Sequence, residues 1–233
     1  MNTKAFRRTK HSLINAALII MIFTLYIAIS SPRIQAAMGA VYDRPYYKGN
    51  KDGKVAIQCA VSWNAAALDK ILNELKTNNT NITFLVSGEW AENNNDMLQR
   101  IRSDGHEIGT LGMKPNEDGN ISWLLDDISN SVERIESITG IKPKLYYSGT
   151  RQRSASSRAA SELELTHVLC TVDLLCARGD DSDIAQRALE AANEGNIILV
   201  QPTTGLADAL PKILDSFRQQ GIEVTVTGEV LGM

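Results

Sequence analysis

Short β-rich runs alternate with helical patterns along most of this chain, and this alternation limits the folds that the chain can adopt. The segments between the runs carry apolar residues at helical spacing, as in Leu68, Ile71, Leu72 and Leu75. Strand, helix and strand repeated in this order predict a parallel sheet whose crossover connections are helices. The seven strand-like segments are residues 55–61, 82–86, 107–111, 144–147, 168–174, 197–201 and 222–226.

Seven strand and helix units in so short a chain favour a small α/β barrel, closed or nearly closed. An open, doubly wound sheet is the alternative. Open, doubly wound sheets often have a glycine-rich phosphate loop after the first strand, and no such loop follows the first strand-like segment here. We therefore expect a distorted seven-stranded (β/α) barrel.

The N-terminus predicts a membrane segment. A basic stretch precedes the apolar run Leu13–Ile29, which as a helix spans about 26 Å, near the lower limit for a bilayer. A weak small-residue cleavage site at Gln35–Ala37 leaves a cleaved signal as the alternative to an uncleaved anchor. Because four basic residues precede the run and only Arg33 follows it closely, we expect a cytoplasmic N-terminus and an extracellular C-terminal domain.

These patterns predict four consecutive regions along the chain. They are a basic cytoplasmic tail at residues 1–11, a transmembrane anchor or signal segment at 12–31, a linker at 32–53 and one folded domain at 54–231.

Charge and cysteine content exclude some classes of protein. The chain has 24 Lys and Arg against 27 Asp and Glu, and five of the basic residues lie within the first 37 residues, which contain no acid. The expected domain is therefore acidic, which argues against nucleic acid as a partner. Three cysteines are an odd number and do not make a disulfide framework. A disulfide or soft-metal pair between Cys59 and Cys176 is a minor alternative to buried thiols.

Six framework segments resemble one family in their order and spacing. The chain is similar to the polysaccharide deacetylases, the NodB-homology domain, and within them to a membrane-anchored branch of spore-forming bacteria. The resemblance implies a barrel of the NodB type over residues 54–231. The segments that carry it are KVAIQ, NITFLVSGEW, IRSDGHEIG, ITGIKPKLYY, TVDLLC and NIILVQPT.

The family implies a metal-dependent carbohydrate N-deacetylase, with zinc or a similar ion held by one Asp and two His. A second Asp serves as the base for the metal-bound water, and another His serves as the acid. At the corresponding positions the base falls on Ala60, the metal ligands on Leu111 and on Pro115 or Lys114, and the acid on Gln201. An amide does not titrate near neutral pH, so Gln201 cannot replace the acid.

The other motifs are altered as well. The third motif is replaced by the stretch from Tyr147 to Thr150, and in the fourth only Asp173 remains of the acids. The chain has three histidines, of which His11 precedes the apolar run. Two histidine ligands and a histidine acid therefore cannot be assembled from His106 and His167. We expect no bound metal and no intact catalytic residue.

The vestigial site still has candidate binding residues. Trp63 and Tyr147 can stack on a sugar ring, although core packing is the more usual role of such residues. The expected lining of the vestigial site is Ala60, Val61, Trp63, Leu111, Pro115, Tyr147, Asp173 and Gln201.

Three functions are compatible with these residues. The first is an inactive, membrane-anchored deacetylase-like protein that binds glycan of the cell wall or spore envelope, or docks onto a wall-modifying complex. The second is an active peptidoglycan or chitin N-deacetylase with a divergent metal site that uses Asp173, Glu117, Asp118 or a cysteine. The third is a structural spacer domain.

Overall fold

The structure is a computed structural model that describes residues 15, 17–24, 26, 44–63, 66–151 and 153–233. It divides the chain into two compact units, Met1–Asp43 and Arg44–Met233. The expected anchor at residues 12–31 and the tail at 1–11 fall largely outside the described residues. Across the residues that are described, no helix is both long and apolar enough to cross a membrane.

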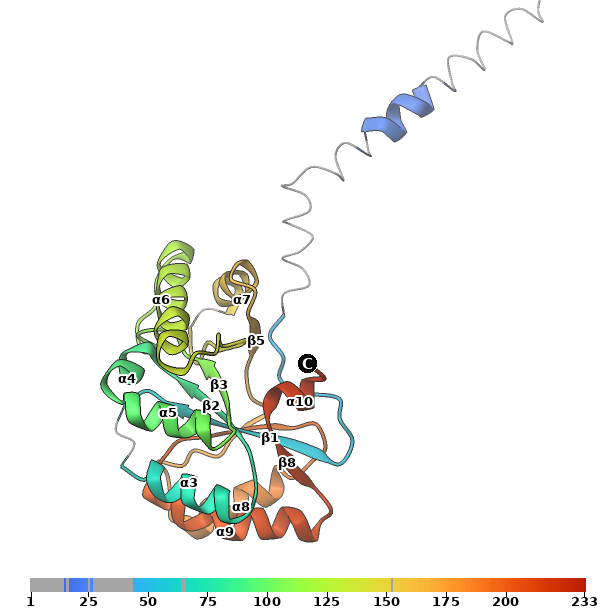
Figure 1. The fold of residues 1–233 in the computed structure, drawn as a ribbon. Helices are drawn as coiled ribbons and strands as arrows, with labels where there is room; N and C mark the ends of the chain where they lie inside the picture. Colours follow the sequence, from blue (N-terminus) through green and yellow to red (C-terminus); the bar gives the residue numbers. More distant parts are fainter. Residues whose placement is uncertain (1–14, 16, 25, 27–43, 64–65, 152) are drawn as a thin grey trace, which may run out of the picture. The chain divides into compact units, whose positions relative to one another are not determined.

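The second unit is built on one parallel sheet (Figure 1). Its central strand β1 pairs with β2 on one side and with β7 on the other, and β8 also pairs with the start of β1. The order along the sheet is β5-β4-β3-β2-β1-β7-β6. The strands are β1 (Lys54–Val61), β2 (Thr83–Val86), β3 (Glu107–Thr110), β4 (Leu145–Tyr147), β5 (Thr166–Val168), β6 (Val172–Asp173), β7 (Ile197–Val200) and β8 (Glu223–Thr225).

The expected strand at residues 168–174 is instead two strands. β5 ends at Val168 and β6 begins at Val172, yet these strands lie at opposite ends of the sheet order. Three intervening residues can connect those ends only if the sheet curls round on itself. The α/β barrel expectation is therefore confirmed as a curled, incompletely closed barrel. Across the described residues, seven strands form its continuous order, and β8 pairs with β1 off this path.

The segment that enters the domain helps to bridge the two ends of the sheet. Tyr46 pairs with Val168, and Lys48 pairs with Asn196 at the start of β7. The amide of Tyr46 donates to the carbonyl of His167 at 2.9 Å. Residues 44–53, which we expected in a linker, are thus part of the compact unit that begins at Arg44.

Most of the helices cover the outside of the curled sheet (Figure 1), whereas Val230 of the last helix packs inside it. The long helix α6 ends at Gly140, which adopts φ +71° and so terminates the helix in a left-handed conformation that glycine favours. Asp180 and Asp183 form a capping box at the start of α8, which explains the acidic GDDSD stretch. The helices are α3 (Leu68–Thr77), α4 (Gly88–Asn93), α5 (Asn95–Ser103), α6 (Ile121–Thr139), α7 (Arg153–Glu162), α8 (Asp181–Glu190), α9 (Thr204–Gln219) and α10 (Thr227–Leu231).

Alternate residues of each strand divide the core into two layers. In β1, Ile57 and Cys59 pack in the large cluster between sheet and helices, whereas Ala56 and Ala60 pack in two small clusters inside the curl. Gln58 lies between those clusters and donates to the hydroxyl of Thr227 at the start of α10. The interior of the curl is therefore filled by side chains of the protein itself.

Candidate functional site

Most of the expected site residues lie at the carboxyl ends of the strands. Because neighbouring strands are parallel, these ends meet at one rim, which is where α/β barrels carry their binding and catalytic groups. Ala60 is the penultimate residue of β1, Leu111 follows β3, and Tyr147 ends β4. Asp173 ends β6, and Gln201 follows β7. The framework thus keeps these positions together.

Hydrocarbon occupies the centre of this rim. The Leu111 side chain is buried and belongs to a compact apolar cluster inside the curl, against which Ala60 and Tyr147 pack. The positions that the family uses for its base and first metal ligand are therefore in one apolar cluster without a donor atom for a metal. The buried members of the cluster are Leu85, Leu111, Leu145 and Val168.

Asp173 and Gln201 bond to one another and to the loop that follows β6. The Gln201 Nε2 donates to Asp173 Oδ1 at 3.2 Å, and the same carboxylate oxygen accepts the amide of Leu175 at 2.8 Å. The Gln201 Oε1 accepts the amide of Cys176 at 3.1 Å. Asp173 thus holds the loop that follows β6. Gln201, at the position of the family's catalytic acid, also bonds to this loop.

Two expected lining residues lie away from this rim centre. Val61 packs in the cluster between sheet and helices, on the opposite face of β1 from Ala60, because strand residues alternate in direction. Trp63 is 62% exposed and lines a separate cavity of about 530 Å³ beside α4 and α5, together with Trp90, Asn93 and Asn94. The expected lining is corrected accordingly.

The tyrosine at the rim is not poised for proton transfer. The Tyr147 hydroxyl lies 4.0 Å from the Cys170 sulfur. Burial raises the pKa of Tyr147, and the neighbouring Cys170 and Asp173 raise it further.

Cys59 and Cys176 are free thiols, so the disulfide alternative is not observed. Burial raises the pKa of the Cys176 thiol to about 11.

The residues at the family's metal position do not fit a metal. Ala60 and Leu111 have no ligand atom, and Pro115 has none in its side chain. Within the described ranges, no group of three or more His, Cys, Asp or Glu is arranged to hold an ion. Asp173 Oδ1 and Gln201 Oε1 each accept a backbone amide of the loop after β6.

The two described histidines serve the framework. His167 lies in β5 between the hydroxyls of Ser157 and Ser148, at 2.8 and 2.9 Å from its two ring nitrogens. Burial, together with the nearby positive charge of Arg153, lowers its pKa to about 4. His106 precedes β3 at the opposite, amino end of the strands, and burial lowers its pKa to about 4 as well. Both rings are therefore neutral at neutral pH.

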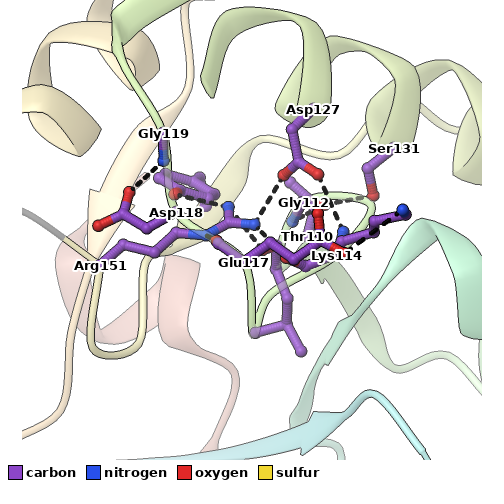
Figure 2. Close-up of polar contacts among 11 residues, drawn as sticks. Thr110, Gly112, Lys114, Glu117, Asp118, Gly119, Asp127, Ser131 and Arg151 are labelled. Carbon is purple, nitrogen blue, oxygen red and sulfur yellow. Dashed lines mark hydrogen bonds and ion pairs between the residues drawn. The ribbon is translucent and has the colours of Figure 1, made fainter. Parts of the chain in front are cut away.

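A buried ion pair holds the loop in which the family carries its metal ligands (Figure 2). Arg151 Nη2 donates to Asp127 Oδ2 at 2.8 Å, and the two side chains are 2% and 4% exposed. The same guanidinium donates to the carbonyls of Leu111, Lys114 and Glu117. The second Asp127 oxygen accepts the amide of Lys114 at 2.9 Å. Both ions thus have partners that compensate for their burial.

Further polar contacts join this loop to α6. The hydroxyls of Thr110 and Ser131 share a hydrogen bond of 2.7 Å, and the Thr110 hydroxyl also accepts the amide of Gly112 (Figure 2). Gly112 has φ +86°, and a side chain there would collide with Asp127 and Arg151. Side chains from α6 and from the loop after β4 therefore hold this loop through its backbone carbonyls and amides.

Sequence reasoning missed Asp127 and Arg151. A signal for Asp127 was present, because it lies on the same helical face as Leu124, Ile128 and Ser131, all of which are buried. A carboxylate on an apolar helix face is rarely buried without a cationic partner. No local pattern marks Arg151 as that partner, because the two residues meet only through the tertiary fold.

The fold is an α/β fold of the deacetylase type, and apolar residues occupy the rim positions at which the resemblance expects a base and a metal ligand. Residues 58–168 match the family model "Polysaccharide deacetylase". Over these residues the chain is similar to the polysaccharide deacetylases, the family that its framework segments resemble.

Named relatives come from Bacillus. The chain is 31% identical over 195 residues to the uncharacterized protein YlxY of Bacillus subtilis, a match that covers 80% of this chain and 60% of that protein. It is 29% identical over 167 residues to a peptidoglycan-N-acetylglucosamine deacetylase of Bacillus cereus, covering 65% of this chain and 58% of that protein. The chain thus spans about three fifths of the length of these two relatives.

Solved structures share the fold. BA3943 of Bacillus anthracis, a pseudoenzyme of the CE4 family, superposes with a TM-score of 0.77 at 23% identity, covering 81% of this chain and 69% of that one. A BA3943 mutant with restored enzymatic activity gives a TM-score of 0.78 at 22% identity, covering 81% and 71%. At these identities the likeness establishes the fold alone.

Proposed function

We propose that this protein is a catalytically inactive deacetylase-like protein that binds cell-wall or spore-envelope glycan. The observation that carries the proposal is the apolar cluster around Leu111, where the family needs a base and a metal ligand. Hydrocarbon at these positions supplies neither a ligand for a metal nor an acceptor for a proton. The pseudoenzyme character of BA3943 supports this conclusion by analogy of fold.

Loss of activity follows from the chemistry of the missing groups. General acid and base catalysis typically contributes about 10²–10⁴-fold to a rate, and a metal ion adds several kcal/mol of transition-state stabilisation. Asp173 cannot restore these contributions alone, because its carboxylate bonds to Leu175 and Gln201.

An acetate-release assay tests inactivity. We expect the purified chain to release no acetate from N-acetylglucosamine oligomers or peptidoglycan above a buffer blank, with or without added Zn²⁺, Co²⁺ or Mn²⁺. Metal-dependent turnover that disappears in Asp173→Ala would instead establish the alternative, an active deacetylase with a divergent metal site.

The cavity beside Trp63 is the surface that supports glycan binding. An exposed indole offers a flat apolar face, and sugar rings present apolar faces of their own. The side-chain amides of Asn93 and Asn94 donate to backbone carbonyls, which leaves their oxygens as acceptors for sugar hydroxyls. Peptidoglycan is the named glycan of the B. cereus relative, and we propose a glycan of this class for the present chain.

Titration with glycan oligomers tests the binding site. We expect saturable binding of peptidoglycan or chitin oligomers, its loss in Trp63→Ala and its partial retention in Trp63→Phe. Lys212→Gln, a substitution of an exposed residue on α9, is the control. No saturable binding by the unmodified chain would favour a spacer or a docking domain for a wall-modifying complex.

The location outside the cell is also a proposal. Four basic residues precede the run Leu13–Ile29, whereas Arg33 is the one basic residue that follows it within the first 37 residues, and this asymmetry supports a cytoplasmic N-terminus and an exported domain. Protease added to intact cells stripped of their wall is expected to digest the domain. Full protection of the domain would reverse the orientation.

A further inference from the structure

A second cavity lies at the opposite end of the strands from the vestigial site. It has a volume of about 390 Å³ and is lined where α5 leads into β3 and where α6 leads into β4. Its charged lining residues are Arg102, Glu107, Lys142 and Lys144, and His106 forms part of its wall. None of the functions considered above uses this cavity.

The three cations of this cavity are not neutralised within the protein. Across the described residues, the salt bridges of the chain do not include Arg102, Lys142 or Lys144, and all three residues are exposed. Pro143, which separates the two lysines, is buried, whereas Lys142 and Lys144 are exposed. The one lining carboxylate, Glu107, accepts hydrogen bonds from Thr83 and Gly228.

His106, which lines this cavity, has a ring nitrogen without a hydrogen-bond partner among the described residues. Its Nδ1 accepts the amide of Ile82 at 3.3 Å, so the neutral ring carries its proton on Nε2. His106 is only 8% exposed. Its Nε2 is buried and has no hydrogen-bond partner among the described residues. Buried polar groups in folded proteins nearly always have a partner, and an unpaired one calls for an explanation such as a ligand or water.

We propose that this cavity is a binding site for a phosphate group. A tetrahedral oxyanion has enough oxygens to accept from a guanidinium fork and two ammonium groups together. The concave shape favours a discrete phosphate over a flat anionic surface. The site is distinct from the Trp63 cavity, so the two are occupied and tested independently.

Histidine NMR on the full chain tests this proposal, because the chain has only three histidines. The full chain, labelled at the histidine Cε1 and purified in detergent, is titrated with inorganic phosphate at constant ionic strength set by sodium chloride. We expect a saturable shift of the His106 signal and no comparable shift of His167, which lies between two serines in β5. Absence of a saturable His106 shift would overturn the proposal.

Charge-removing variants distinguish the site from general electrostatics. Lys142→Gln with Lys144→Gln is expected to weaken phosphate binding on the order of tenfold or more while leaving the melting temperature unchanged, since both residues are exposed. Lys212→Gln on α9 removes an exposed cation elsewhere and should leave binding unchanged. Equal weakening in the double variant and the control would contradict a site.

Two further ligands separate the sources of phosphate. Glycerol 3-phosphate is expected to compete with inorganic phosphate at the same His106 signal. Vesicles of phosphatidylglycerol serve as the lipid comparison. Binding to these vesicles without any response to phosphate or glycerol 3-phosphate would overturn the proposal, because it would indicate a charged surface rather than a phosphate site.

Discussion

Arg151 and Asp127 form an ion pair of 2.8 Å beneath the loop that follows β3, with both side chains almost completely buried. The pair joins the loop after β4 to helix α6, and through three carbonyls and one amide it holds the segment from Leu111 to Glu117. This loop, the metal-ligand loop of the family, is thus positioned by internal contacts.

Removing one member of this pair is expected to destabilise the fold strongly. Asp127→Ala leaves a buried guanidinium without its charge partner, which lowers the free energy of unfolding by about 3–5 kcal/mol. Urea denaturation followed by circular dichroism measures the change. Arg158→Gln, in the exposed pair Arg158–Glu162, is the control and should change stability by less than about 1 kcal/mol. Similar values for the two variants would contradict the structural role assigned to Arg151 and Asp127.

Stability is expected to fall as the pH is lowered from 7 towards 5. His106 and His167 have pKa values of about 4 in the folded chain, below the ordinary value of 6.5. The unfolded chain therefore binds more protons in the window between 6.5 and 4, so protonation favours unfolding there. Once the pH is well below 6.5, each histidine lowers the free energy of unfolding by on the order of 2–3 kcal/mol. Urea denaturation at pH 7.5, 6.0 and 5.0 measures the slope.

The variant His167→Asn checks the origin of this pH dependence. The free energy of unfolding should change less between pH 7 and pH 5 in this variant, because one histidine with a lowered pKa has been removed. An unchanged slope in His167→Asn and in His106→Asn would show that the carboxylates cause the pH dependence instead.

The thiols are expected to react slowly in the folded chain. Burial raises the pKa of Cys59, Cys170 and Cys176, and the thiolate is the reactive form. With an aromatic disulfide reagent at pH 8, we expect slow labelling at the partly exposed Cys170 and none at Cys59. All three thiols should react rapidly in urea. Fewer than three reactive thiols in urea would reveal a disulfide that the structure does not contain.

Restoring a single metal ligand is expected to destabilise the domain. Leu111→His removes apolar contacts from the interior cluster and buries an imidazole there, at a loss of about 2–5 kcal/mol. Added Zn²⁺ should not raise the melting temperature of this variant, because Ala60 and Pro115 supply no further ligand. EDTA should leave the melting temperature of the unmodified chain unchanged. A zinc-dependent rise in Leu111→His would show that other residues complete a metal site.

Local patterns were sufficient to predict the architecture. The nearly continuous apolar run in Lys54–Val61 is typical of a strand that is buried on both faces, and the apolar stripe of α6 predicts the helix that covers the sheet. The losses at Ala60, Leu111 and Gln201 were also apparent, because the identity of a side chain decides whether it can bind a metal or move a proton.

Tertiary contacts determined the remaining features. The run at residues 168–174 has continuous strand character, yet it divides into β5 and β6 because the curl of the sheet brings its two ends together there. Tyr46 joins the domain because its backbone pairs with Val168, which depends on the partner strand and not on local propensity. Arg151 meets Asp127 only when the loop after β4 reaches α6, since ion pairing depends on distance in space and these residues are 24 positions apart in the chain.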